Sequence, residues 1–134
     1  MLNRLYVTYI KRKKPTDEIY SGRASGIYDD ETDNMIQEGL NILATRERNH
    51  HKNTEGFEPA EIDNISQDSD ATRGREQMLI DFHGGAKSTG GNSGNQINGI
   101  SAKNENREKY LDAAKKIFGS LTILLLILLL NRLL

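Results

Sequence analysis

The chain has 134 residues, of which 36% are hydrophobic and 28% are charged, a composition that fits one globular domain with a modest core. Its net charge of −1 excludes a protein held on nucleic acid by its overall field, so any phosphate-binding site has to be local. The chain has no cysteine, which excludes a disulfide scaffold and thiolate metal sites.

The N-terminal residues predict a β-hairpin. Residues 3–12 place apolar side chains on two alternating faces and are rich in β-branched and aromatic residues, as in a strand. Residues 13–17, "KKPTD", have the composition of a turn. We therefore expect a second strand over residues 18–24, paired with the first.

A helix and an irregular link are predicted next. Apolar residues recur at helical spacing over residues 32–50, with Thr32 or Asp33 as the N-cap. Residues 53–66 contain Gly and Pro and have no clear period. This link predicts a loop with a short third strand.

Helical spacing returns over residues 69–84, with Ser69 or Asp70 as the N-cap and Gly84 as the stop signal. The next segment, residues 84–101, is rich in Gly, Ser and Asn and predicts a long polar loop.

The C-terminal segment is the most biased part of the sequence. A third helix is predicted from about residue 104, and we expect it to continue past Gly119. Residues 121–130 are Leu, Ile and Thr throughout and offer no polar face. As a helix, residues 117–134 would be about 27 Å long, slightly less than the hydrocarbon thickness of a bilayer. We expect this tail to enter a membrane or to mediate self-association; the alternative is that it folds back and completes the core.

Together these elements predict an α+β fold, in which a small antiparallel sheet begins with a β-hairpin and is flanked by helices, followed by a C-terminal apolar helix. Residues 1–118 are expected to form one domain, and residues 119–134 the apolar tail.

The hairpin carries two short motifs, "VTY" at 7–9 and "IYSG" at 19–22. This pair resembles the signature of the GIY-YIG nuclease family, a Gly-Ile-Tyr-like tripeptide followed by a Tyr-Ile-Gly-like one. Tyr9 and Tyr20 match the two tyrosines, and Gly22 matches the glycine of the second motif. Val7 replaces the first glycine.

Three later segments extend the resemblance. "RERNHH" resembles the end of the family's first helix, "REQMLI" resembles its glutamate-bearing second helix, and "QINGIS" supplies the closing asparagine, Asn98. "YSGRASG" and "SGNQINGIS" are similar to the GIY-YIG-like domains at the C-terminal tips of bacterial polymorphic toxins, including Rhs-type proteins. The resemblance covers residues 3–118.

The resemblance implies a metal-dependent endonuclease that hydrolyses DNA phosphodiester bonds. Glu76 offers a carboxylate to Mg²⁺ (or Mn²⁺), and arginines suit phosphate oxygens. A tyrosine would activate the water or orient the phosphate, and His50 would assist proton transfer. The implied catalytic residues are Tyr9, Tyr20, Arg23, Arg46, His50 and Glu76; the implied nucleic-acid contacts are Arg23, Arg46, Arg48, Lys87 and Asn98. Tyr20, Arg46 and Glu76 are expected to converge on one concave face, with Tyr9, Arg23, His50 and Asn98 nearby. The glycines beside Tyr20 would let the nucleic-acid backbone approach closely.

As a toxin domain, the protein would be bacterial, act on DNA in the cytoplasm of a target cell and be bound by a neutralising immunity protein. Membrane association would involve residues 117–134.

Other interpretations stay open. Tyr9 and Tyr20 also suit cross-strand packing, Arg46 and Arg48 suit a helix C-terminus, and Glu76 suits a solvated helix face. A second enzyme class is a ββα-metal nuclease using the three histidines, His50, His51 and His83, with Asn53 or Asn64. A third class is a membrane-tethered interaction or pore-forming protein that acts through its tail.

Overall fold

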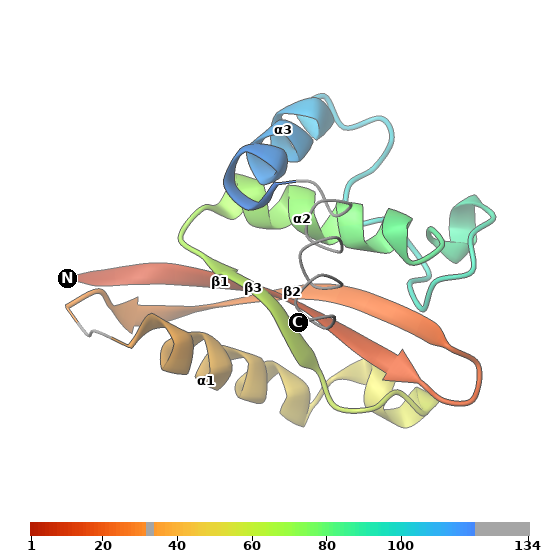
Figure 1. Ribbon diagram of the computed structural model, residues 1–134, viewed down its shortest axis with the longest axis horizontal. Coiled ribbons are helices and arrows are strands. Elements are labelled where there is room, and N and C mark those ends of the chain that lie inside the picture. The colour runs from red at the N-terminus through yellow and green to blue at the C-terminus, as the bar shows by residue number, and fades with distance from the viewer. Residues whose placement is uncertain (32–33, 120–134) are drawn as a thin grey trace, which may run out of the picture.

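The computed structural model describes residues 1–31 and 34–119 and has the expected α+β fold (Figure 1). Three antiparallel strands form one sheet in the order β2-β1-β3, where β1 is Leu2–Lys13, β2 is Glu18–Asp29 and β3 is Glu61–Ser66. The predicted hairpin and third strand are confirmed. The second strand continues beyond residue 24, which leaves β2 as a long edge strand.

Helices cover both faces of the sheet. α1 (Met35–Arg48) lies on one face, α2 (Ser69–Phe82) lies on the other, and α3 (Arg107–Phe118) packs on α2 (Figure 1). Two short 3-10 segments, η1 (His51–Glu55) and η2 (Lys87–Thr89), follow α1 and α2 in the chain. The three predicted helices are therefore present.

The N-caps differ from those predicted. Asn34 caps α1, because its Oδ1 accepts from the backbone N–H of Gln37 at 3.1 Å. Asp68 caps α2, accepting from the N–H of Ala71 at 2.9 Å. In both places several short polar residues follow one another in the sequence, and only the backbone conformation selects which one precedes the first helical turn.

The third helix ends at Phe118. The prediction that it continues through Gly119 is therefore wrong. Gly119 has φ of 75°, a left-handed value at which a right-handed helix cannot continue. The apolar tail from residue 120 lies outside the described residues. Within residues 1–31 and 34–119, no helix combines the length and the apolar character needed to cross a bilayer.

Strand alternation assigns the side chains of β1 to the two faces of the sheet. Tyr9 and Lys11 are fully buried, and Lys11 Nζ contacts the carboxylate of Glu47 in α1 at 2.7 Å. This set of side chains therefore faces α1. Thr8 faces α2, and its hydroxyl donates to Asp63 at 2.7 Å.

The polar loop after α2 is tied to the free edge of β2. The side-chain amide of Asn95 accepts from the backbone N–H of Ser21 at 2.9 Å and donates to the carbonyl of Ser21 at 2.8 Å. One residue earlier, the N–H of Gly94 donates to the carbonyl of Ile19 at 2.7 Å. The loop thus covers the first half of this edge and brings residues 95–99 next to α2.

Candidate active site

A cleft of about 670 Å³ lies where five segments meet: β2, the C-terminal end of α1, η1, α2 and the loop after α2. Its lining includes six residues that the sequence singled out, namely Tyr20, Arg23, Arg46, His51, Glu76 and Asn98. These residues are far apart in the chain, so the fold brings together what the motif order had only suggested.

The cleft extends around the free edge of the sheet. The register pairs Lys11 with Tyr20 and Thr8 with Arg23. Because cross-strand partners share a face, Tyr20 lies on the α1 side and Arg23 on the α2 side. The Arg23 guanidinium consequently reaches Glu76 of α2, with 3.4 Å between Nε and Oε1.

Tyr9 and His50 lie beneath the cleft, in the core. Tyr9 is fully buried and His50 is 2% exposed, and 2.8 Å separates Tyr9 Oη from His50 Nε2. The backbone N–H of Lys52 donates to His50 Nδ1 at 3.1 Å, so Nδ1 carries no proton. In the neutral ring the proton is then on Nε2, and His50 donates to Tyr9.

The protonation states follow from this burial. Burial, with the charge of Arg46 as the next cause, lowers the pKa of His50 to about 4, so the ring is neutral at pH 7. Burial also raises the pKa of Tyr9 above its usual value. His50 therefore orients Tyr9, and both of its ring nitrogens are occupied within the core.

Tyr20 lies between this buried pair and the cleft. Its ring centroid is 5.1 Å from that of His50 and 6.4 Å from that of Tyr9. Burial and then the charge of Glu76 raise the pKa of Tyr20, whereas Arg46 and a hydrogen bond from Tyr9 lower it. Tyr20 is thus a neutral phenol with an O–H to donate.

Glu76 is the buried carboxylate of the cleft. It is 9% exposed, and burial raises its pKa, an effect that the charge of Arg23 opposes. The backbone of Gly99 lies directly over it, since a Cβ at that position would be 2.2 Å from Oε1. This close contact requires glycine at position 99, and the carboxylate borders the open volume of the cleft.

This donor set fits a divalent cation held by one carboxylate. Mg²⁺ is commonly bound through one or two carboxylates and keeps several waters, which the open space beside Glu76 would accommodate. In the part of the chain that the structure describes, no group of three or more histidine, aspartate or glutamate side chains is placed to share a metal ion. Of the histidines considered for a ββα-metal nuclease, His51 lines the cleft, whereas His83, at the end of α2, does not.

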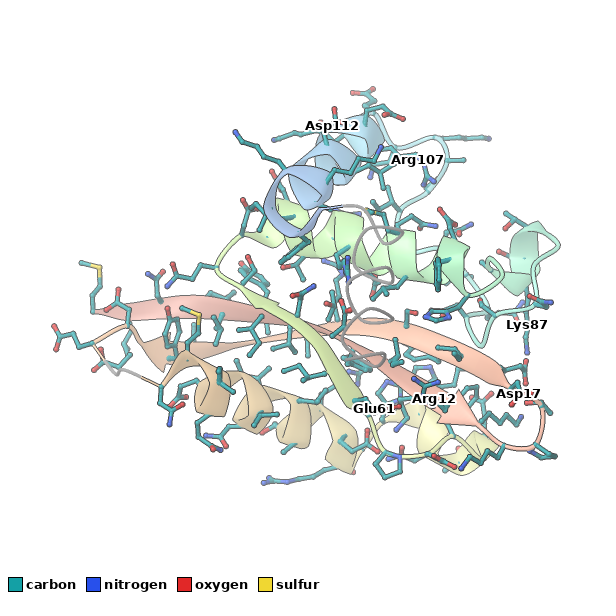
Figure 2. All side chains as sticks on the ribbon, viewed as in Figure 1. Arg12, Asp17, Glu61, Lys87, Arg107 and Asp112 are labelled. Atoms are coloured by element: carbon teal, nitrogen blue, oxygen red, sulfur yellow. The ribbon has the colours of Figure 1, made fainter. Side chains whose placement is uncertain are left out.

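Two predicted nucleic-acid contacts lie elsewhere. Arg48 is exposed but does not line the cleft. Lys87 is paired with Glu18 next to the hairpin turn, with 2.5 Å between Nζ and Oε1 (Figure 2). The sequence showed their charge, but not the direction in which each side chain points.

Gly22 also differs from its predicted role. A Cβ at Gly22 would lie 2.5 Å from both Cζ and Oη of Tyr9. The glycine therefore makes room for the Tyr9 ring across the strand pair, and does not open the backbone to a ligand.

The sequence analysis missed Lys52 and Asn95. The Lys52 ammonium lies 5.7 Å from the centroid of the Tyr20 ring and 3.0 Å from Glu55 Oε1, at the wall of the cleft. Asn95 holds the loop on β2, and it is one of several Asn residues in a Gly-rich segment. The adjacency of Lys52 to the paired histidines was the available signal; for Asn95 there was none.

Comparison with known proteins identifies no relative: no protein-family model, curated protein or solved structure matches this chain.

Proposed function

We propose that this protein is a metal-dependent endonuclease of GIY-YIG type that hydrolyses DNA phosphodiester bonds. The observation that carries the proposal is the single cleft lined by Tyr20, Arg23, Arg46 and Glu76, which come from three separate elements and are the residues that the motif resemblance selects. Phosphodiester hydrolysis requires these groups within reach of one phosphate.

In this proposal the two arginines hold the scissile phosphate. Arg23 and Arg46 approach the cleft from opposite faces of β2, so a phosphate at the strand edge meets both guanidinium groups. As water attacks phosphorus and the P–O bond to the leaving group breaks, negative charge accumulates on the phosphoryl oxygens. Fixed guanidinium donors stabilise that charge.

Tyr20 orients the phosphate or the attacking water. Its raised pKa keeps the proton on Oη at neutral pH, so it donates a hydrogen bond. Behind it, the hydrogen-bonded pair of His50 and Tyr9 contacts the Tyr20 ring and holds the phenol in position. Of the two roles implied for a tyrosine, orientation is the one that this protonation state favours.

Glu76 would hold the cation. When bound, Mg²⁺ or Mn²⁺ supplies positive charge beside the scissile phosphate. The Glu76 carboxylate contributes the ligand oxygen, and its pairing with Arg23 keeps it close to the phosphate-binding group.

The resemblance further supports a role as a bacterial toxin domain acting in a target cell and neutralised by an immunity protein. These parts of the proposal rest on the sequence motifs alone.

A plasmid-nicking assay tests the function. We expect supercoiled DNA to be nicked in Mg²⁺ and left intact in EDTA, and Glu76→Gln to remove the activity. Glu55→Gln is the matched control, since Glu55 lines the same cleft but is 48% exposed and paired with Lys52.

A second pair of variants tests the arginines. Arg46→Ala should lower the nicking rate at least ~100-fold, as expected for loss of a fixed donor to a transition-state oxyanion. Arg48→Ala, two positions along the same helix and outside the cleft, should leave the rate unchanged. Equal effects of Arg46→Ala and Arg48→Ala, or nicking that persists in Glu76→Gln, would overturn the proposal.

A further inference from the structure

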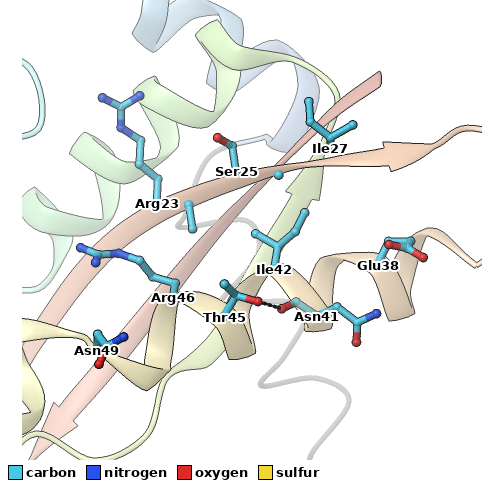
Figure 3. Close-up of a pocket in the computed structure, with 11 residues that line it drawn as sticks. Arg23, Ser25, Ile27, Glu38, Asn41, Ile42, Thr45, Arg46 and Asn49 are labelled. Atoms are coloured by element: carbon cyan, nitrogen blue, oxygen red, sulfur yellow. Dashed lines mark hydrogen bonds between the residues drawn. The ribbon is translucent and has the colours of Figure 1, made fainter. Parts of the chain in front are cut away.

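A second cleft, of about 570 Å³, lies between the edge of β2 and one side of α1 (Figure 3). Its β2 wall is the stretch from Arg23 to Ile27, and its α1 wall is a helical face. Cavities of 300–1,000 Å³ are typical for small ligands. We call this space the flanking cleft. Its lining from α1 comprises Glu38, Asn41, Ile42, Thr45, Arg46 and Asn49.

The flanking cleft is continuous with the candidate active site. Arg23 and Arg46 are the residues that line both, and they lie where the two spaces join. Both guanidinium groups lie at the end of the cleft away from Glu38, Arg23 on one side of β2 and Arg46 on the other (Figure 3). A phosphate held by these arginines would therefore have the active site on one side and the flanking cleft on the other.

The rest of the flanking cleft suits an uncharged group. Ile42 supplies apolar surface on the α1 side, where it packs against Gly26 of β2, and the 55%-exposed Ile27 supplies apolar surface on the other side of the strand edge. Asn41 and Asn49 add amide donors and acceptors along the rim. The carboxylate of Glu38, at the far end from the arginines, repels a second phosphate and accepts hydrogen bonds from hydroxyl or amino groups.

The edge of β2 contributes backbone groups to the same space. The N–H and C=O of Ser21 point away from β1, since Asn95 binds both. Because strand residues alternate, Arg23 and Ser25 present their backbone groups to the same edge, beyond the part that the loop covers. These fixed donors and acceptors match the edge of a nucleobase.

From the two arginines shared by both spaces we infer that the flanking cleft binds a nucleoside whose phosphate is held by Arg23 and Arg46. The biological meaning of this inference rests on the nuclease function proposed above. In that nuclease, the bound nucleoside is the one next to the scissile phosphate. A peptide strand pairing with β2 would use the same backbone groups, but it would not explain arginines at the junction.

The test uses thymidine 5′-monophosphate and inorganic phosphate as ligands of the full chain, in EDTA, followed by NMR of backbone amides and arginine side chains. Thr45 is an exposed residue of α1 that lines the flanking cleft, so the larger side chain of Thr45→Met would fill part of that cleft. Methionine is also a good helix former, so α1 should tolerate the substitution. Ala44→Met is the matched control, because Ala44 is exposed on the same helix and lines neither cleft.

We expect the nucleotide to shift the amides of Ser25 and Thr45 as well as Arg23 and Arg46, whereas phosphate shifts the two arginines only. Thr45→Met should weaken nucleotide binding at least ~10-fold, a loss of about 1.4 kcal/mol, without changing phosphate binding. Ala44→Met should change neither. If Thr45→Met prevents folding, Asn41→Met serves instead, because Asn41 is another exposed residue of α1 that lines the flanking cleft.

Equal affinity for nucleotide and phosphate, or a nucleotide affinity that Thr45→Met leaves unchanged, overturns the flanking site. If this happens while the wild type nicks plasmid DNA, only the flanking site fails and the nuclease proposal stands. If the wild type does not nick DNA but binds the nucleotide in a manner sensitive to Thr45→Met, the site is supported and the nuclease proposal fails.

Discussion

Protonation of His50 is expected to destabilise the fold as the pH falls below 6.5. The ring is 2% exposed, and its Nδ1 accepts from the N–H of Lys52, so the second proton has no place without breaking that hydrogen bond. The pKa of His50 is about 4 in the folded chain, against 6.5 for the free side chain. Between these values the unfolded chain binds more protons than the folded one, so the free energy of unfolding falls as the pH falls. The loss amounts to about 2 kcal/mol at pH 5 and about 3 kcal/mol at pH 4.

Urea denaturation followed by circular dichroism at pH 7.5 and pH 5 measures this loss, in wild type and in His50→Gln. Glutamine does not titrate, so its drop in unfolding free energy between the two pH values should be smaller by about 2 kcal/mol. Other groups that titrate between pH 5 and pH 7.5 are present in both proteins, so their contributions to the difference in unfolding free energy cancel. His51→Gln is the control, since His51 is exposed and should retain most of the wild-type drop. An identical drop in wild type and His50→Gln would refute the assignment of a buried, neutral His50.

Three further predictions address packing, the loop and the tail. Gly22→Ala should lower the free energy of unfolding by about 1–3 kcal/mol, because its methyl group would displace the Tyr9 ring; an unchanged melting temperature would contradict this. Asn95→Ala should cost about 1–3 kcal/mol and speed amide exchange at Ser21, whose backbone groups lose their partner. Unchanged exchange at Ser21 would mean that the loop is not held through this amide. Truncation after Gly119 should leave cooperative unfolding intact and remove vesicle binding or self-association, whereas an unfolded product would identify the tail as core.

Local signals in the sequence were sufficient for the elements of the fold. The two-residue period of residues 3–12 and the helical spacing over 69–84 depend only on neighbours in the chain, and both elements are present. The same local signals were ambiguous at the helix ends. Thr32, Asp33 and Asn34 are all good caps by residue type, and the choice of Asn34 depends on where the chain leaves β2.

The motifs also selected several residues that line one cleft, although Arg48 and Lys87 lie outside it and Lys52 and Asn95 of its lining were missed. They did not show the geometry between residues distant in the chain. That Gly22 accommodates the Tyr9 ring follows from the pairing of β1 with β2, and that Glu76 faces Arg23 follows from the packing of α2 on the sheet.

What the sequence by itself determined is therefore the α+β class, the order of the elements and a set of candidate residues, since these depend on local periodicity and side-chain chemistry. Tertiary structure alone decided which candidates face the cleft, that His50 is buried and neutral, and that Asn95 holds a loop across the edge of β2. The physical reason is that burial, pKa and loop attachment depend on contacts between residues up to 75 positions apart, such as Ile19 and Gly94, which no local pattern encodes.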